Sequence, residues 1–193
     1  PVIAFRNGHG IIDGSSDLSV TLPAGRELWG QCDVVLALGT RCQTAQMQWG
    51  VDDKIKIIHI DIDIDEIGRI SIPELGINAD LKDALPLLLS AIEGKERNRA
   101  DWLETTREVK LKYSKIFSEK LAPQLAWLSA IRAELPRDGI FVDELTQVGY
   151  VSRFAFESYK PRTFLSTGYQ GTLGWGIASA MGAAHARRDV PVV

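Results

Sequence analysis

The chain has 193 residues, of which 45% are hydrophobic and 24% are charged, so it can bury a core and global disorder is excluded. Its formal net charge of -3 gives no electrostatic reason to attract nucleic acid or an anionic membrane. No run approaches the roughly 20 apolar residues that cross a bilayer, and no charged-then-apolar leader opens the chain. We therefore expect a cytoplasmic protein without nucleic-acid or membrane partners.

Cysteine and histidine usage gives no sign of a metal or disulfide site. Cys32 and Cys42 are too few for a disulfide scaffold, and the three histidines lie far apart in the sequence. We expect no metal site in this chain.

Two apolar runs in the N-terminal half predict buried strands, Val34–Leu38 and Ile55–Ile64. About 15 residues separate them, which is enough for a crossover connection, so parallel pairing is predicted. In the second run the isoleucines at even-numbered positions share one face. The other face becomes acidic at Asp61 and Asp63, toward the strand end where open α/β sheets bind ligands.

The next segments predict helices. Asp80 followed by Asp83 is typical of an acidic helix start, and apolar residues then recur at helical spacing until Gly94. Pro86 lies inside this pattern and could shift the start or kink the helix. The charged stretch 95–120 contains apolar residues among many charged ones, which predicts an amphipathic linker helix.

A second α/β pattern begins at Pro123, a plausible first helical residue. Its buried stripe is predicted to contain Leu125, Leu128, Ile131 and Leu135. The elements predicted after it are a strand at 139–142, a helix from about Glu144, a strand at 164–167, a helix at 176–187 and a strand at 190–193.

The segment 168–184 is the most informative part of the chain. Four glycines fall within nine residues, between a predicted strand and a small-residue helix, so the backbone can come close to a flat or anionic ligand. Their spacing, G-x-x-G-x-x-G-x-G, differs from the dinucleotide fingerprint, which disfavours a nicotinamide-dependent dehydrogenase. From glycine content by itself, a tight structural turn is an equal alternative.

Residues 171–176, Gly-Thr-Leu-Gly-Trp-Gly, resemble the G-T-M-G-F-G segment of acetolactate synthases, which depend on thiamine diphosphate. The resemblance implies a cofactor site at Gly171, Thr172 and Leu173. The Gly171 carbonyl would accept a hydrogen bond from the 4'-amino group, and Leu173 would wedge between the two rings. Tyr169, Gln170 and Ala178 depart from the family pattern, which bears on the substrate subclass.

Residues 142–147 follow their predicted strand as the T-D-V-G-Q-H segment does in the same family. That family uses this loop to hold the diphosphate, which implies that Thr146 and Gln147 are donors to it. The alternative is a plain helix start capped by Asp143.

A second match lies in the N-terminal half. Residues 56–68 resemble the K-I-I-H-I-D-I-D-P-A-E-I-G of these enzymes, and residues 35–41 resemble their V-L-x-L-G-x-R. Some relatives bind FAD or an adenine nucleotide such as ADP here, which implies a nucleotide site at Arg41, Asp61, Ile62 and Asp80. Other relatives keep this domain without a nucleotide.

Together these matches imply an α/β fold: a Rossmann-like parallel-sheet central domain over 1–94, a linker helix over 95–120, and a truncated α/β thiamine-diphosphate-binding domain over 121–193. The family's activating glutamate and its Mg²⁺-binding G-D-G…N motif are not among these residues. We therefore expect no catalytic residue and no metal ligand here, and no activity from the isolated chain.

The intact protein is expected to be a 2-keto acid decarboxylase or carboligase, a lyase or transferase that uses thiamine diphosphate with Mg²⁺ on a small 2-keto acid. Family members of this kind imply a homodimer or homotetramer. The alternative from another class is a non-catalytic adenine-nucleotide-binding or assembly module.

Overall fold

The computed structural model describes residues 1–95, 100–168 and 170–193, so Tyr169 lies outside the described residues. The chain is α/β, and its sheets contain parallel strands. It divides into two compact units, one formed by Pro1–Gly25 with Ala100–Val193 and the other by Arg26–Arg99. The sequence analysis instead divided the chain into consecutive domains with boundaries at residues 94 and 120. These domain boundaries stay a prediction.

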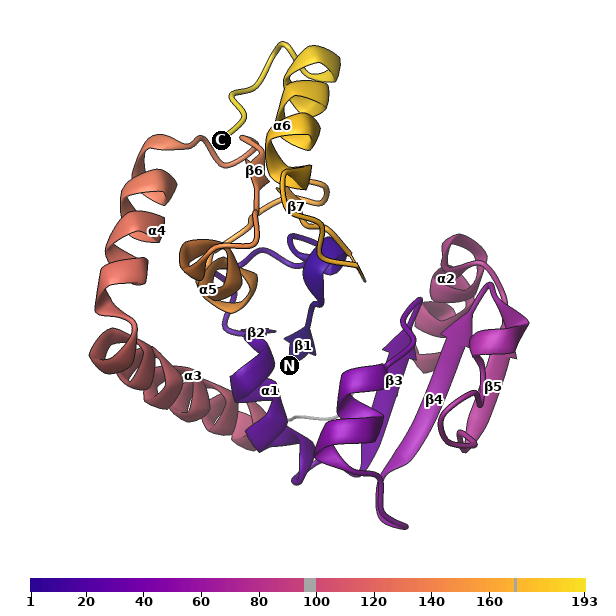
Figure 1. Cartoon of the computed structure of the whole chain (residues 1–193). Coiled ribbons are helices and arrows are strands. Elements are labelled where there is room, and N and C mark those ends of the chain that lie inside the picture. The colour runs from indigo at the N-terminus through magenta and orange to yellow at the C-terminus, as the bar shows by residue number, and fades with distance from the viewer. Residues whose placement is uncertain (96–99, 169) are drawn as a thin grey trace. The chain divides into compact units, whose positions relative to one another are not determined.

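The unit Arg26–Arg99 contains a three-stranded parallel sheet of order β3-β4-β5 (Figure 1). The strands are β3 (Val34–Leu38), β4 (Lys56–Asp61) and β5 (Leu75–Asn78). The parallel pairing of the first two was predicted and is confirmed. The sequence analysis missed β5, because four residues with a central glycine give little periodicity.

Strand β4 is shorter than predicted. It ends at Asp61, and a short 3₁₀-helix, η3 (Ile64–Glu66), follows, so the expectation of a strand to residue 64 is wrong. The Asp61 Oδ1 accepts from the Asp63 amide at 2.9 Å, and the Asp63 Oδ1 accepts from the Asp65 amide at 3.0 Å. These local bonds turn the chain out of the sheet, and Ile62 is 70% exposed as a result.

One face of this sheet is covered by a small apolar core. Trp29 ends α1 (Leu22–Trp29), packs edge-on against Trp49 of the π-helix η2 (Ala45–Trp49), and joins buried Ala37 and Ile57. The Trp29 indole N–H donates to the Gly50 carbonyl at 2.7 Å. The unit also contains α2 (Leu81–Ile92), which Asp80 caps as predicted and which accommodates Pro86.

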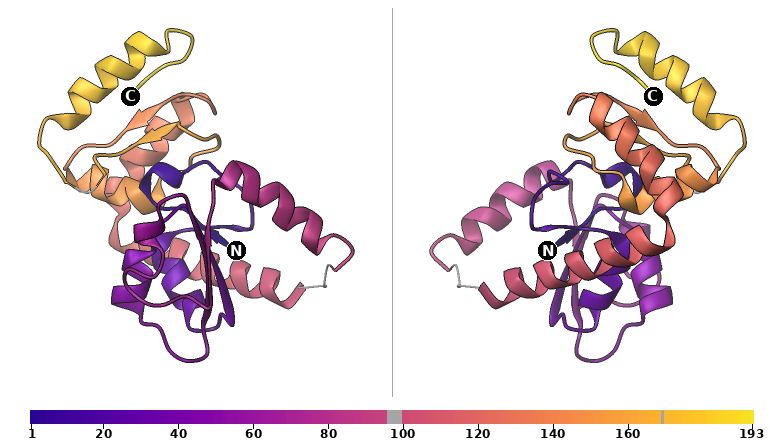
Figure 2. Two further views of the ribbon diagram at one scale, coloured as in Figure 1. Left: turned by 90° about the vertical axis from the view of Figure 1, so that its right-hand side faces the viewer. Right: turned by 90° about the vertical axis from the view of Figure 1, so that its left-hand side faces the viewer.

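The other unit is built around two parallel strands, β6 (Phe141–Val142) and β7 (Phe164–Leu165), which run side by side in Figure 2. Helices α4 (Ala122–Glu134) and α5 (Gln147–Ala155) supply the rest of the core. Leu128 and Leu135 of the predicted stripe are buried in it. Stacked rings of Phe141, Phe156 and Phe164 fill its centre.

Further elements complete this unit. They are the short strands β1 (Val2–Ile3) and β2 (Ser19–Val20), the 3₁₀-helix η1 (Arg6–Gly8), α3 (Ala100–Lys120) and α6 (Trp175–Ala186). The predicted strand at 190–193 is reduced to one bridge, from Val192 to Ile140. The N-terminal segment is tied to α3, because Arg107 pairs with Asp17 at 2.6 Å and the Lys110 ammonium donates to the Ser16 carbonyl at 2.6 Å.

Candidate functional site

The glycine-rich segment forms an open turn before α6. Gly168 and Gly174 have positive φ angles of 73° and 83°, which L side chains rarely adopt. The Trp175 amide donates to the Thr172 carbonyl at 3.3 Å, closing the turn at the start of the helix. Gly174 is the N-cap of α6 and has no side chain with which to cap it.

Leu173 lies on the outside of this turn and is 78% exposed. Within the described residues Leu173 is therefore not part of a hydrophobic core. Ile177 and Met181 follow at helical spacing along α6 and are 72% and 69% exposed. An apolar side chain in this position is available to a ligand or to another protein surface.

The loop between β6 and α5 is organised differently from the prediction. The helix begins at Gln147 rather than near Glu144, and its N-cap is Thr146, whose hydroxyl accepts from the Gly149 amide at 3.0 Å. Asp143 is not the cap. Its fully buried carboxylate instead accepts from Arg153 Nε at 2.7 Å and from the Ser166 hydroxyl at 2.9 Å.

The structure brings the two predicted cofactor segments together. A Cβ placed on Gly171 would lie 3.0 Å from the Leu145 side chain, so the bare backbone of Gly171 rests on the β6–α5 loop. Thr146 ends that loop, Gln147 is the first residue of α5, and both are exposed. The Thr146 hydroxyl keeps a proton to donate, whereas the side-chain Oε1 of Gln147 accepts from Gln124 Nε2 at 3.1 Å.

Glu144 connects the same two segments and was not predicted as a functional residue. Its Oε1 accepts from the Leu145 amide at 2.7 Å and its Oε2 from the Gly176 amide at 2.8 Å. Hydrogen bonds from the amides of Leu145, Gly176 and Gly174 hold the pKa of Glu144 below its usual value. Glu144 stands where the family segment has valine, so the resemblance gave no signal for it.

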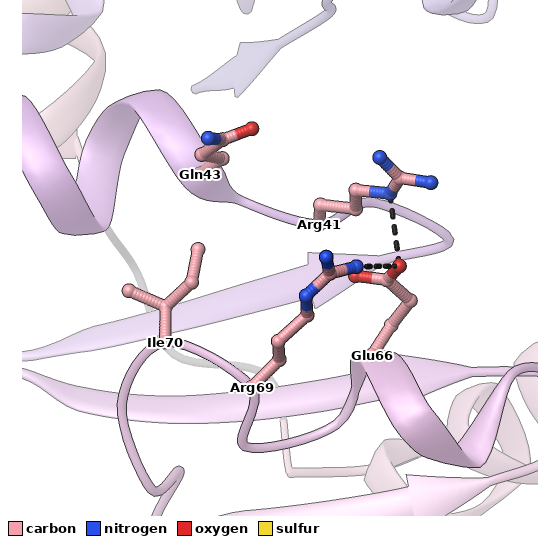
Figure 3. A pocket seen from close by; sticks show the side chains of 5 residues that line it. All are labelled: Arg41, Gln43, Glu66, Arg69 and Ile70. Atoms are coloured by element: carbon pink, nitrogen blue, oxygen red, sulfur yellow. Dashed lines mark hydrogen bonds and ion pairs between the residues drawn. The ribbon is translucent and has the colours of Figure 1, made fainter.

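In the unit Arg26–Arg99, Arg41 and Asp61 lie at the same edge of the sheet. Arg41 follows β3 and Asp61 ends β4, at the carboxyl ends of paired parallel strands. Their side chains have different partners. Arg41 Nε lies 3.0 Å from Glu66 Oε1, which Arg69 Nη1 also contacts at 2.7 Å. Figure 3 shows these groups around a cavity of about 60 Å³ that Gln43 and Ile70 also line.

The other predicted nucleotide residues are less well placed for a ligand. Asp61 is 8% exposed and is engaged by the Asp63 amide. Asp80 is used as the α2 cap and accepts from the Lys82 amide at 2.9 Å. The sequence analysis missed Glu66 and Arg69, although their spacing on η3 and the following turn was a readable sign of an ion pair.

A larger cavity of about 410 Å³ lies within the unit formed by Pro1–Gly25 and Ala100–Val193. His9, Arg153 and Ser158 line it, and each has a buried side-chain atom that finds no hydrogen-bond partner among the described residues: His9 Nε2, Arg153 Nη2 and Ser158 Oγ. Burial lowers the pKa of His9, whose ring stacks on Phe164 at 4.5 Å. Nothing in the sequence indicated this cavity.

Within residues 1–95, 100–168 and 170–193, no helix is long and apolar enough to cross a membrane. The same residues contain no group of three or more side chains able to hold a metal ion.

Comparison with known proteins identifies two matching profiles. The "Thiamine pyrophosphate enzyme, central domain" matches residues 1–88, and the "Thiamine pyrophosphate enzyme, C-terminal TPP binding domain" matches residues 146–193. Thiamine pyrophosphate is another name for thiamine diphosphate.

Individual relatives agree with these profiles. The chain is 35% identical over 174 residues to acetolactate synthase 1, chloroplastic, of Nicotiana tabacum, covering 83% of this chain and 25% of the relative. It is 28% identical over 169 residues to acetolactate synthase isozyme 1 large subunit of Escherichia coli, covering 84% and 29%. It is 27% identical over 189 residues to "Probable 2-ketoarginine decarboxylase AruI" of Pseudomonas aeruginosa, covering 95% and 34%.

The chain thus spans a quarter to a third of the length of these relatives. Both profiles come from one enzyme family, and they match in the order in which the two resemblances occur in the sequence. The chain therefore belongs to the thiamine-pyrophosphate-dependent enzymes, with matches to their central domain and their C-terminal TPP-binding domain.

Proposed function

We propose that the full-length protein is a thiamine-diphosphate-dependent enzyme that decarboxylates or ligates a small 2-keto acid. Acetolactate synthases and a 2-ketoarginine decarboxylase among the relatives support a reaction of this class. The exact 2-keto acid is left open, because these relatives differ in their named activities. As expected from the sequence analysis, we also propose a cytoplasmic homodimer or homotetramer.

The observation that carries the proposal is the position of Leu173. It is 78% exposed on a turn whose Gly171 backbone rests on the loop that ends in Thr146 and Gln147. A flat two-ring cofactor needs a bare backbone that it can approach, an apolar side chain for ring contact, and donors for its diphosphate. These residues supply all three.

In this proposal the Gly171 carbonyl would accept a hydrogen bond from the aminopyrimidine and Leu173 would contact the rings, on a turn that the Thr172 carbonyl closes. Thr146 and Gln147 would donate to the diphosphate, and residues outside this chain would hold Mg²⁺. The bound cofactor supplies an electron sink for the loss of CO₂ from the 2-keto acid. The described residues contribute binding and orientation.

The direct test is a calorimetric titration of thiamine diphosphate with Mg²⁺ into the full-length protein, followed by an assay of CO₂ release from pyruvate and benzoylformate. We expect saturable binding and turnover of at least one 2-keto acid. The isolated 193-residue chain should show neither tight binding nor turnover. A full-length protein that binds no thiamine diphosphate would refute the proposal.

A second candidate function is supported by the edge of the β3-β4-β5 sheet. Arg41 and Asp61 lie there together, and the guanidinium groups of Arg41 and Arg69 both approach the Glu66 carboxylate. This arrangement suits the phosphates of FAD or ADP, with Asp61, Ile62 and Asp80 beside the nucleoside. Titration of ADP into the chain tests this nucleotide site independently of thiamine diphosphate.

A further inference from the structure

Glu144 supplies a cap that α6 cannot supply for itself. The first amides of a helix have no partner within the helix and require an acceptor. The N-cap of α6 is Gly174, which has no side chain, and the Gly176 amide is instead satisfied by Glu144 Oε2 at 2.8 Å. The acceptor therefore comes from the β6–α5 loop, about thirty residues earlier in the chain.

The contact is tight enough to set the distance between the two segments. A Cβ on Gly176 would lie 3.0 Å from the Asp143 carbonyl oxygen and 3.1 Å from both Cβ and Oε2 of Glu144. A Cβ on Gly171 would lie 3.0 Å from the Leu145 side chain. Loop and turn thus touch at two glycines, one on each side of the turn that presents Leu173.

The charge on Glu144 suits this position. A carboxylate is favoured at a helix N-terminus by the helix dipole, and hydrogen bonds from amides to an ionised acceptor are stronger than those between neutral groups. The lowered pKa of Glu144, caused by the amides of Leu145, Gly176 and Gly174, agrees with the geometry.

We propose that Glu144 is a positioning residue that fixes the glycine turn 171–174 against the β6–α5 loop, and so sets the Gly171 carbonyl and Leu173 relative to Thr146 and Gln147. The consequence for the cofactor rests on the proposed function. The cap itself does not, because it is formed by the described residues without any ligand. The competing explanation is that Glu144 contributes to stability only.

The first experiment measures the cap without cofactor. Hydrogen exchange of the Leu145 and Gly176 amides is followed by NMR in the chain and in Glu144→Ala, with Glu134→Gln as a control at an exposed glutamate. Exchange of both amides should accelerate by at least about tenfold in Glu144→Ala, as expected when a hydrogen bond to a charged group is lost. It should not change in the control. Unchanged exchange in Glu144→Ala would overturn the proposal.

The second experiment separates positioning from stability in the full-length protein. Because a displacement of about 1 Å can cost on the order of 10²-fold in rate, Glu144→Ala should lower kcat at saturating thiamine diphosphate by about 10- to 100-fold. Cofactor affinity should change by less than about threefold, since the diphosphate donors remain. Glu144→Gln retains one acceptor oxygen and should recover part of the rate.

Gly176→Ala approaches the same contact from the other side. A Cβ at this position would lie 3.0 Å from the Asp143 carbonyl oxygen and 3.1 Å from Glu144, so Gly176→Ala should displace the turn and lower Tm. A purely structural role predicts that kcat of the folded variant is unchanged. Positioning predicts a fall in kcat like that of Glu144→Ala. Wild-type kcat in folded Glu144→Ala would overturn the positioning role.

Failure of the proposed function has a different signature. If wild-type full-length protein binds no thiamine diphosphate, both the proposed function and the positioning role of Glu144 are refuted. Amide exchange still decides in that case whether Glu144 caps α6. If the wild type binds and turns over and Glu144→Ala behaves identically, only the inference about Glu144 falls.

Discussion

Arg153 on α5 and Asp143 at the end of β6 form an ion pair, with 2.7 Å between Arg153 Nε and Asp143 Oδ2. The Asp143 side chain is fully buried, and that of Arg153 is 16% exposed. Ser166, just after β7, donates to the same carboxylate oxygen. The pair thus joins the carboxyl ends of both strands to the helix that follows the candidate diphosphate loop.

Removal of this carboxylate should destabilise the protein strongly. Asp143→Ala leaves the guanidinium of Arg153 buried without its counter-charge, and losing one partner of a buried pair costs about 3–5 kcal/mol. Asp138→Ala is the matched control, because Asp138 pairs with Lys160 at 3.5 Å on the surface, where such pairs contribute about 0–1 kcal/mol. Urea unfolding of both variants measures the difference. Equal losses would show that the Asp143–Arg153 pair is not a stabilising feature.

Replacing Leu173 with alanine should affect turnover and leave stability nearly unchanged. The side chain is 78% exposed, so its loss removes little buried area, whereas its proposed contact with both cofactor rings is lost. We expect kcat of the full-length protein to fall by about 10²-fold, as for a misplaced reactive group, with little change in cofactor affinity. Leu173→Met should be nearly silent because it keeps the apolar bulk.

The control for Leu173 is Leu87→Ala, at a comparably exposed leucine on α2. Tm and kcat are measured for all three variants. Unaltered turnover in folded Leu173→Ala would rule out a contact with the cofactor.

Arg41→Ala should weaken binding of ADP at the β3-β4-β5 sheet edge. Hydrogen bonds to charged groups contribute about 1.5–3 kcal/mol, so a loss of roughly 10- to 100-fold in affinity is expected. Lys82→Ala is the control, since Lys82 is a cation near the start of α2 that does not line the Arg41 cavity. Titration calorimetry at two salt concentrations measures both. Equal affinities for wild type and Arg41→Ala would place the nucleotide elsewhere or exclude it.

Acid should destabilise the protein partly through His9. Burial lowers the pKa of His9 from 6.5, so the unfolded chain takes up a proton first as the pH falls. Stability contributed by the neutral ring is complete above pH 6.5 and is lost progressively below it, until the folded protein also becomes protonated. His9→Phe retains the stacking on Phe164 and should reduce the fall in Tm between about pH 7 and pH 5.

His185→Phe removes an exposed histidine and should leave that pH dependence as it is in the wild type. Thermal unfolding at a series of pH values compares the variants. If Tm of His9→Phe falls with pH as steeply as Tm of the wild type, the acid sensitivity comes from other groups.

Much of this protein could be predicted from local residue order. Val34–Leu38 is a strand as predicted, Asp80 caps its helix, and Pro123 lies in the first turn of α4. Each outcome depends on residues that are neighbours in the sequence. An apolar run between turn residues forms a strand, a carboxylate just before a helix accepts hydrogen bonds from its first amides, and the proline ring fits the first turn of a helix. Family membership was likewise readable, because it depends on ordered short motifs.

Tertiary structure decided features that depend on residues far apart in the chain. The exposure of Ile62 has a local cause instead, because Asp61 and Asp63 accept hydrogen bonds from amides two residues ahead and turn the chain out of the sheet, which the apolar alternation did not reveal. Leu173 could equally have been a core residue by its sequence. Its exposure became clear only once the turn and α6 were placed.

Glu144 shows the same limit most directly. As the second of two acidic residues after a short strand it resembles an ordinary helix start, and its partner Gly176 lies in a different element. The local sequence pattern indicates the conformational preferences of adjacent residues. A hydrogen bond between distant residues depends on how the intervening strand and helices pack.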